Sequence, residues 1–110
     1  MTVPVSKLHF TYYSILPRSP VSIEWKPTRK LELMSLPEVI AEIAPGEDVR
    51  SLRLTVIGPG LKISEEFDME DEAGFITLKS LIRREVLRNL ENSEGHLMYS
   101  ITIAVMSPAS

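Results

Sequence analysis

The stretch from Asp68 to Glu94 constrains the fold most, because its apolar residues recur with the period of a helix. The members of this stripe lie three or four residues apart, with two further leucines beside them: Phe75, Leu78, Leu81, Ile82, Val86, Leu87 and Leu90. Such spacing places them on one face of a helix, which is then buried against the rest of the domain. Asp71 and Glu72 precede the stripe, where acids suit the positive end of the helix dipole. We therefore predict one main helix over about residues 75–91.

Short stretches that are rich in β-branched and aromatic residues, or that alternate between apolar and polar residues, predict strands around this helix. They are Lys7–Leu16, Val21–Trp25, Leu31–Leu33, Arg50–Ile57 and Leu97–Met106. The first two fit a hairpin. The last is apolar at nearly every position, so it belongs either in the centre of a sheet or at a subunit contact. Leu61 and Ile63 begin another strand, which we expect to give way to a solvated acidic connection over Glu65–Glu72.

Residues 37–44, PEVIAEIA, fit two structures. Pro37 suits the first position of a short helix, for which Ser35 would supply the cap. Val39, Ala41 and Ile43 would equally share one face of a strand. A run this short does not decide between the two periods.

These elements together predict the fold class. Many short strands and one substantial helix are typical of an α+β or mainly β domain. A chain of 110 residues is large enough for one core and too small for two. We expect a single compact, β-sandwich-like domain over residues 1–110, with the helix of residues 75–91 packed on it.

The composition excludes several classes of protein. With no cysteine the chain has neither disulfides nor thiolate chemistry, and it suits a reducing compartment, the cytosol or alternatively the nucleus. No apolar run approaches the roughly 20 residues that span a bilayer, and the N-terminus lacks the core of a signal peptide. The net charge of -3 argues against a generic polyanion binder, although it leaves room for a local basic patch.

Catalytic and metal-binding patterns are missing from the sequence. His9 and His96 are the only histidines, each alone on its segment, whereas a metal site needs several ligands at structured spacing. The acidic run lacks the central glycine of a calcium-binding loop. Gly58–Gly60 lacks the Lys and Ser/Thr of a phosphate-binding loop, so we interpret it as a turn. We therefore expect a non-enzymatic protein with no catalytic residue, no metal site and no cofactor.

Two basic clusters are the most suggestive residues for binding. The first lies on the predicted helix, where cations one turn apart could address the phosphates of RNA or of anionic lipid: Lys79, Arg83, Arg84 and Arg88. A solvated face, neutralised by nearby acids, is the alternative for this cluster. The second lies beside Trp25, between two predicted strands: Lys26, Arg29 and Lys30. Aromatic and basic residues together suit single-stranded nucleic acid, but Trp25 is in phase with Val21 and Ile23, so we expect it in the core.

The order of several segments resembles the matrix proteins of bornaviruses and their nyamivirus relatives, which are negative-strand RNA viruses. The co-linear segments are ILPRSPVSIEW from residue 15, the Leu36-Pro37 step, IAPGEDVRSLRLTV from residue 43, FITLKSL from residue 75 and VLRNLENSEGHLMYSITIAVMS from residue 86. They cover most of residues 13–107, and the likeness lies in their order.

The resemblance implies a compact β-sandwich with helical additions, in which residues 37–44 form a strand. It also implies homo-oligomers, often tetramers, that line the inner face of the virion envelope and contact RNA, the ribonucleoprotein and anionic membrane. In the infected cell we expect the protein in the host cytoplasm or alternatively in the nucleus. Under this hypothesis the two basic clusters bind RNA or anionic lipid, and no catalytic residue is carried over. The first alternative is a protein–protein interaction adaptor with no nucleic-acid or membrane role. The second is an enzyme or ligand carrier with its pocket between sheet and helix.

Overall fold

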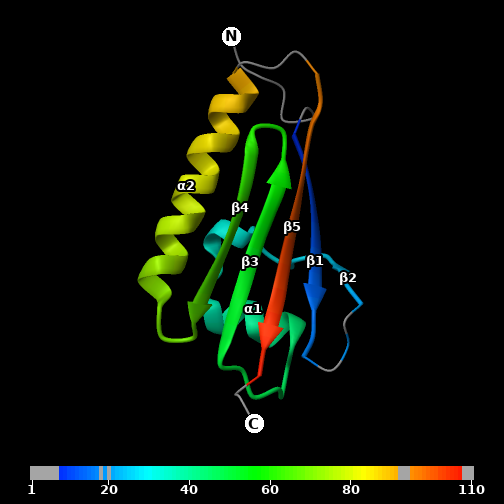
Figure 1. Cartoon of the computed structure of the whole chain (residues 1–110), viewed down its shortest axis with the longest axis vertical. Helices are drawn as coiled ribbons and strands as arrows, with labels where there is room; N and C mark the ends of the chain where they lie inside the picture. Colours follow the sequence, from blue (N-terminus) through cyan, green and yellow to red (C-terminus); the bar gives the residue numbers. More distant parts are fainter. Residues whose placement is uncertain (1–7, 18, 20, 92–94, 108–110) are drawn as a thin grey trace.

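The computed structural model describes residues 8–17, 19, 21–91 and 95–107. Within them five strands form one sheet in the order β2-β1-β5-β3-β4 (Figure 1). The strands are β1 (Leu8–Ile15), β2 (Ile23–Trp25), β3 (Ser51–Gly58), β4 (Leu61–Asp68) and β5 (Leu97–Met106). The helices are the short 3-10 helix η2 (Leu31–Leu33), α1 (Leu36–Ile43) and α2 (Glu72–Glu91). The predicted α+β class is confirmed, although the described strands form a single sheet and not the two packed sheets of a sandwich.

Strand β5 lies in the middle of this sheet. It pairs in parallel with β1, from Leu8 opposite Leu97 to Ile15 opposite Ala104, and antiparallel with β3. β2 pairs with β1, and β4 with β3, both antiparallel. The predicted hairpin near the start of the chain and the central place of the last strand are therefore confirmed; Lys7, where we expected the first strand to begin, lies outside the described residues.

The helices cover one face of the sheet and leave the other open. Alternate residues of the two central strands are buried: Leu52, Leu54, Val56, Tyr99, Ile101, Ile103 and Val105. They form one core with the apolar residues of the helices: Leu36, Val39, Ile43, Phe75, Leu78, Ile82 and Val86. The residues that alternate with them, such as Arg53, Ile57 and Met98, are exposed on the opposite face. In Figure 1 the ribbons of α1 and η2 accordingly pass behind the strands.

Helix α2 begins one turn earlier than predicted, at Glu72. Asp71 caps it, since its Oδ1 accepts a hydrogen bond from the Gly74 N–H at 3.0 Å. Four residues of the predicted stripe are buried, Phe75, Leu78, Ile82 and Val86, and Leu81 and Leu90 are partly buried. Leu87, which we expected beside the stripe, is 46% exposed. This leucine therefore faces away from the centre of the core and is available to another surface.

Residues 36–43 form a helix, so the strand implied by the family resemblance is wrong for this segment. Ser35 and Glu38 form a capping box, in which Ser35 Oγ accepts from the Glu38 N–H at 3.3 Å and Glu38 Oε1 accepts from the Ser35 N–H at 3.4 Å. Glu72 of α2 accepts from the Leu36 N–H at 2.9 Å. Three of the N-terminal N–H groups that a helix leaves unsatisfied, or that flank it, are thereby paired, which favours the helix over the strand.

The predicted strand over Leu31–Leu33 is also wrong, because this segment closes into the 3-10 helix η2. The Leu33 N–H donates to Lys30 O at 2.9 Å, and the Met34 N–H donates to Leu31 O at 3.0 Å. The tight turn buries Leu31 and Met34 in the core and leaves Leu33 60% exposed. Residues three apart eclipse in a 3-10 helix, so the spacing of the buried pair fits this structure better than the period of a strand.

The acidic run does not begin as a solvated connection: its first acids belong to β4. Glu66 lies opposite Arg53 of β3, and their Oε1 and Nη2 atoms are 3.3 Å apart. Phe67 points to the other face, where its buried ring meets Phe75 of α2 with ring centres 5.8 Å apart. Because β4 is an edge strand, its acids remain in water while one aromatic ring enters the core.

Gly58–Gly60 forms the predicted turn, and it joins β3 to β4. Pro59 O accepts from Asn89 Nδ2 at 2.8 Å and from the Tyr99 hydroxyl at 3.2 Å. The turn is therefore fixed both to α2 and to β5.

Replacing Gly58 with alanine should destabilise the fold. A Cβ there would lie within 3.0 Å of three carbons of the buried Tyr99 ring, which cannot move without losing its hydrogen bonds. We expect Gly58→Ala to lower the free energy of unfolding by about 1–3 kcal/mol in urea titrations. Gly95→Ala is the control, since a Cβ there has no heavy atom within 4 Å. Equal stability of the two variants would contradict the packing of Gly58 on Tyr99.

Candidate functional site

The structure places the seven predicted basic residues in two regions that face each other across a groove. Lys79, Arg83, Arg84 and Arg88 lie on α2, and Lys26, Arg29 and Lys30 lie between β2 and η2. Their side chains have different roles. Arg29 and Lys79 bond to other parts of the fold, and Lys79 also lines the groove together with Lys30 and Arg83. The other three lie on the surface: Lys26, Arg84 and Arg88.

Lys79 turns inward. Its Nζ donates to the carbonyl oxygens of Leu31, Glu32 and Met34 at 3.4, 3.3 and 2.6 Å, and it lies 4.3 Å from the centre of the Phe75 ring. Burial lowers the pKa of Lys79, while three nearby glutamates oppose that shift. Its main role is therefore to hold η2 against α2 through these hydrogen bonds. The sequence predicted an outward-facing cation at this position, and the structure places it inward.

Arg29 and its neighbours anchor the second cluster to α1. Arg29 Nη1 pairs with Glu38, the residue that also completes the capping box of α1. Glu42 of α1 accepts from Trp25 Nε1 at 3.2 Å, from the Thr28 N–H at 3.2 Å and from the Thr28 hydroxyl. Trp25 is half-buried against the core, as predicted, so its indole is already engaged within the fold.

Arg84 and Arg88 lie on the surface of α2 and share one acid. Glu85 Oε1 is 4.0 Å from Arg84 Nε, and Glu85 Oε2 is 3.4 Å from Arg88 Nη1. The two arginine side chains are 68% and 61% exposed. Exposed ion pairs of this kind contribute little and exchange readily with other partners. One acid thus accompanies two accessible cations, and Lys26 is a further exposed cation outside the groove.

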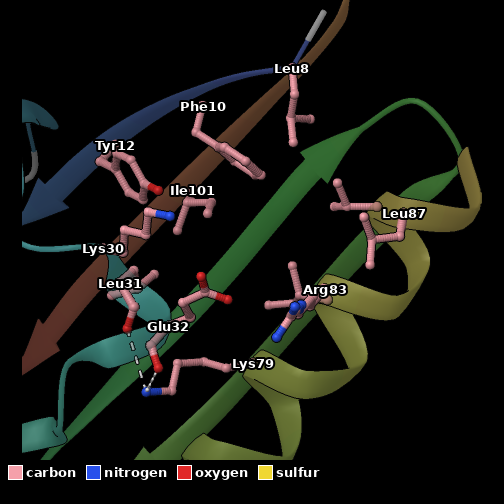
Figure 2. Close-up of a pocket in the computed structure, with 12 residues that line it drawn as sticks. Leu8, Phe10, Tyr12, Lys30, Leu31, Glu32, Lys79, Arg83, Leu87 and Ile101 are labelled. Carbon is pink, nitrogen blue, oxygen red and sulfur yellow. Dashed lines mark hydrogen bonds between the residues drawn. The ribbon is translucent and has the colours of Figure 1, made fainter. Parts of the chain in front are cut away.

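The groove lies between β1 and α2 and has a volume of about 370 Å³ (Figure 2). Among the described elements, α2 packs mainly against β4 and η2, whereas β1 has its main contacts with the strands β2 and β5, and the groove lies between them. Its lining consists mostly of apolar side chains: Leu8, Phe10, Tyr12, Leu31, Ile82, Val86, Leu87 and Ile101. Lys30, Glu32, Lys79 and Arg83 complete it. Lys30 of one predicted cluster and Arg83 of the other therefore line the same cavity.

The two ends of the groove differ in polarity. Leu8 and Leu87 lie at one end in Figure 2, whereas Tyr12, Lys30 and Glu32 lie at the other. Burial raises the pKa of Tyr12, and the carboxylate of Glu32 raises it further, so the phenol stays protonated. The polar end thus carries the Tyr12 hydroxyl, the Glu32 carboxylate and the Lys30 ammonium group, and Arg83 lies across the groove on α2.

The structure also brings together the two histidines, which looked isolated in the sequence. His9 Nε2 and His96 Nδ1 are 3.4 Å apart, because β1 runs parallel to β5 and aligns His9 with Met98. Predicting this pair would have required knowing that the two strands are parallel neighbours, and no local sequence pattern shows that. Among the described residues, no group of three or more His, Cys, Asp or Glu side chains is placed to hold a metal ion.

Comparisons with protein-family models, with curated proteins and with solved structures found no match. None of the helices in the described part of the chain combines the length and apolarity that crossing a bilayer requires. The resemblance to matrix proteins therefore stays a prediction.

Lys79→Met should lower stability, because it leaves the carbonyl groups of η2 without their charged donor. We expect a loss of roughly 1.5 kcal/mol in the free energy of unfolding, measured in urea. Arg83→Met removes the same charge from an exposed position one turn away and should change stability by less than about 0.5 kcal/mol. If Lys79→Met is as stable as the wild type, Lys79 does not fasten η2.

The contact of Glu42 with Thr28 predicts a dependence of stability on pH. The hydrogen bond from the Thr28 hydroxyl is the main cause that lowers the pKa of Glu42 below its ordinary value of 4.5. In the unfolded chain this carboxylate takes up its proton at higher pH than in the folded chain. The stabilisation is therefore complete above pH 4.5 and is lost as pH falls through the lower, folded pKa.

Glu42→Gln removes this titration. We expect the wild type to be more stable than Glu42→Gln at pH 7, with the difference shrinking at pH 3. Urea midpoints followed by the fluorescence of Trp25, the one tryptophan of the chain, would measure both values. A difference that is the same at the two pH values would contradict the assignment.

Proposed function

We propose that this protein is a non-enzymatic structural protein of the viral matrix type, which self-associates and attaches to anionic membrane at the inner face of an envelope. The matrix assignment is supported by the co-linear order of segments over residues 13–107. The membrane attachment is supported by one observation on the fold. Cations and accessible apolar side chains lie together where α2 faces Lys30.

Arg83 and Leu87 are one turn apart on α2, and both line the groove. Leu87 is 46% exposed, and Arg84 and Arg88 extend the basic surface along the helix. An anionic bilayer attracts such cations electrostatically and accepts apolar side chains below its headgroups. The combination favours a membrane surface over a purely polar polyanion.

RNA is less favoured by the same residues. Single-stranded RNA binds to exposed aromatic rings beside cations, but Trp25, the aromatic residue next to the second cluster, is half-buried and donates its Nε1–H to Glu42. RNA binding is therefore the alternative that the vesicle experiment must distinguish from membrane binding.

The uncovered face of the sheet supports self-association. Ile57, Met98 and Met106 are 51%, 66% and 39% exposed there, in alternation with residues of the core. Contiguous exposed apolar patches are typical of protein contacts. Ile57 and Met98 lie near each other, since Ile57 pairs with Ser100, and Met106 lies at the other end of β5. A homo-oligomer, tetrameric by the resemblance, would cover them. On this proposal the cations of α2 face the membrane, because α2 lies on the opposite side of the sheet from this surface.

Neutralising α2 should release the protein from anionic vesicles. We expect the triple variant Arg83→Gln, Arg84→Gln and Arg88→Gln to bind vesicles of phosphatidylserine and phosphatidylcholine roughly 100-fold more weakly, at about 1 kcal/mol per cation. Co-sedimentation at low and at moderate salt measures this. The matched control changes three cations on or next to β3 and β4: Arg50→Gln, Arg53→Gln and Lys62→Gln. It should bind as the wild type does.

Equal losses in the two triple variants would show a nonspecific charge effect and contradict the assignment to α2. Tight binding to a short RNA, with no binding to vesicles, would replace membrane by RNA as the target. Light scattering on a sizing column tests self-association in the same samples. A monomer that binds neither vesicles nor RNA would favour the adaptor alternative over the matrix protein.

A further inference from the structure

We infer that the groove between β1 and α2 is a binding site for one acyl chain of an anionic amphiphile, whose headgroup is held by Lys30 at the polar end and by Arg83 from the opposite side of the groove. This inference deepens the proposed membrane attachment and rests on it for the source of the ligand, a membrane lipid. It adds a stoichiometric site with a preference for chain length, which attraction to a charged surface does not require.

The apolar part of the groove fits a hydrocarbon chain. From Tyr12 through Phe10 to Leu8, successive inward residues of β1 form one wall, and Ile82, Val86 and Leu87 of α2 contribute to the opposite one. The wall on β1 extends over four residue steps, about 13 Å at the rise of a strand. The volume of about 370 Å³ lies within the usual range of small-molecule sites, roughly 300–1,000 Å³.

Beyond Tyr12 the side chains of this part are apolar, so a base or a sugar would find no hydrogen-bonding group along it except the Tyr12 hydroxyl at its end. Leu8, Val86 and Leu87 offer only apolar contact, and the Phe10 ring is already stacked on Tyr99 with centres 5.7 Å apart. A flexible chain can follow such a surface and gains from every methylene that leaves water. The apolar end therefore selects hydrocarbon over a nucleotide.

The polar end determines the charge of the headgroup. Lys30, Lys79 and Arg83 oppose a single acid, Glu32, among the lining residues. Lys79 is already directed to the carbonyl groups of η2, which leaves Lys30 and Arg83 as the cations for a ligand. Both are exposed, and they approach from the two sides of the groove in Figure 2. Guanidinium and ammonium groups bind phosphate or carboxylate. The carboxylate of Glu32 repels negative charge, so a headgroup with one phosphate or carboxylate is favoured over one with several.

Titration calorimetry of the full chain with alkyl phosphates, each below the concentration at which it forms micelles, tests the inference. We expect dodecyl phosphate to bind with one molecule per chain and ethyl phosphate not to bind measurably. In the series from octyl to dodecyl phosphate, affinity should rise about fourfold per methylene until the groove is filled. Many molecules per chain, or affinity that does not depend on chain length, would overturn the site.

Two pairs of variants locate the binding. Leu87→Glu places a carboxylate on the apolar wall and should abolish binding of dodecyl phosphate. Ile76→Glu makes the same change at an exposed position of α2 that does not line the groove, 53% exposed, and should leave binding unchanged. Arg83→Gln should weaken binding about tenfold, whereas Arg53→Gln, on the other face of the sheet, should not. Equal effects within either pair would overturn the assignment; circular dichroism checks that each variant is folded.

The failures of the two proposals are distinguishable. If anionic vesicles bind while dodecyl phosphate does not, the groove is not an acyl site and the surface attachment stands. If dodecyl phosphate binds with the expected variant pattern while vesicles do not, the groove site stands and the membrane function is overturned.

Discussion

The pairing of β5 on both of its edges is the constraint on which the rest of the structure depends. This strand joins β1, from the beginning of the chain, to β3, from its middle, and its buried residues supply much of the core under both helices. The backbone groups of β5 are hydrogen-bonded on both edges, and its apolar side chains are buried on one face, so the order of the strands is fixed. The positions of the groove, the histidine pair and the open face all follow from that order.

The coverage of this sheet by helices is uneven, and the uneven coverage creates the candidate site. Among the described elements, helix α2 has its main contacts with β4 and η2, while β1 has its main contacts with β2 and β5. The fold therefore retains an apolar cavity beside a basic helix. Neighbouring cations of the predicted cluster have different roles. Lys79 stabilises the fold through its hydrogen bonds to η2, whereas Arg83, one turn later, lines the cavity and is exposed.

Much of the fold could be predicted from the sequence, since the apolar stripe of α2 and the alternation of β3 are local patterns, and the residues they mark are the ones buried in the core. The errors arose where contacts distant in sequence decide the structure. Leu31–Leu33 resembles a strand, but Lys79 holds its carbonyl groups in a 3-10 turn. The capping box of Ser35 and Glu38 was readable as a helix signal, but the bond from Leu36 to Glu72 was not. For the site, the sequence indicated Lys30 and Arg83 as candidate cations. It could not show that both line one groove, because that depends on where the pairing of β1 with β5 places β1.

The position of β5 near the end of the described sequence has a consequence for how the protein is made. Until residues 97–106 have been synthesised, β1 with β2 and β3 with β4 are two separate hairpins, each with an unpaired edge that β5 will later cover. Such edges are templates for pairing with other chains, and contacts between distant segments form slowly. These two edges therefore stay unpaired until β5 is inserted between β1 and β3, and a chain interrupted before residue 97 cannot close the sheet.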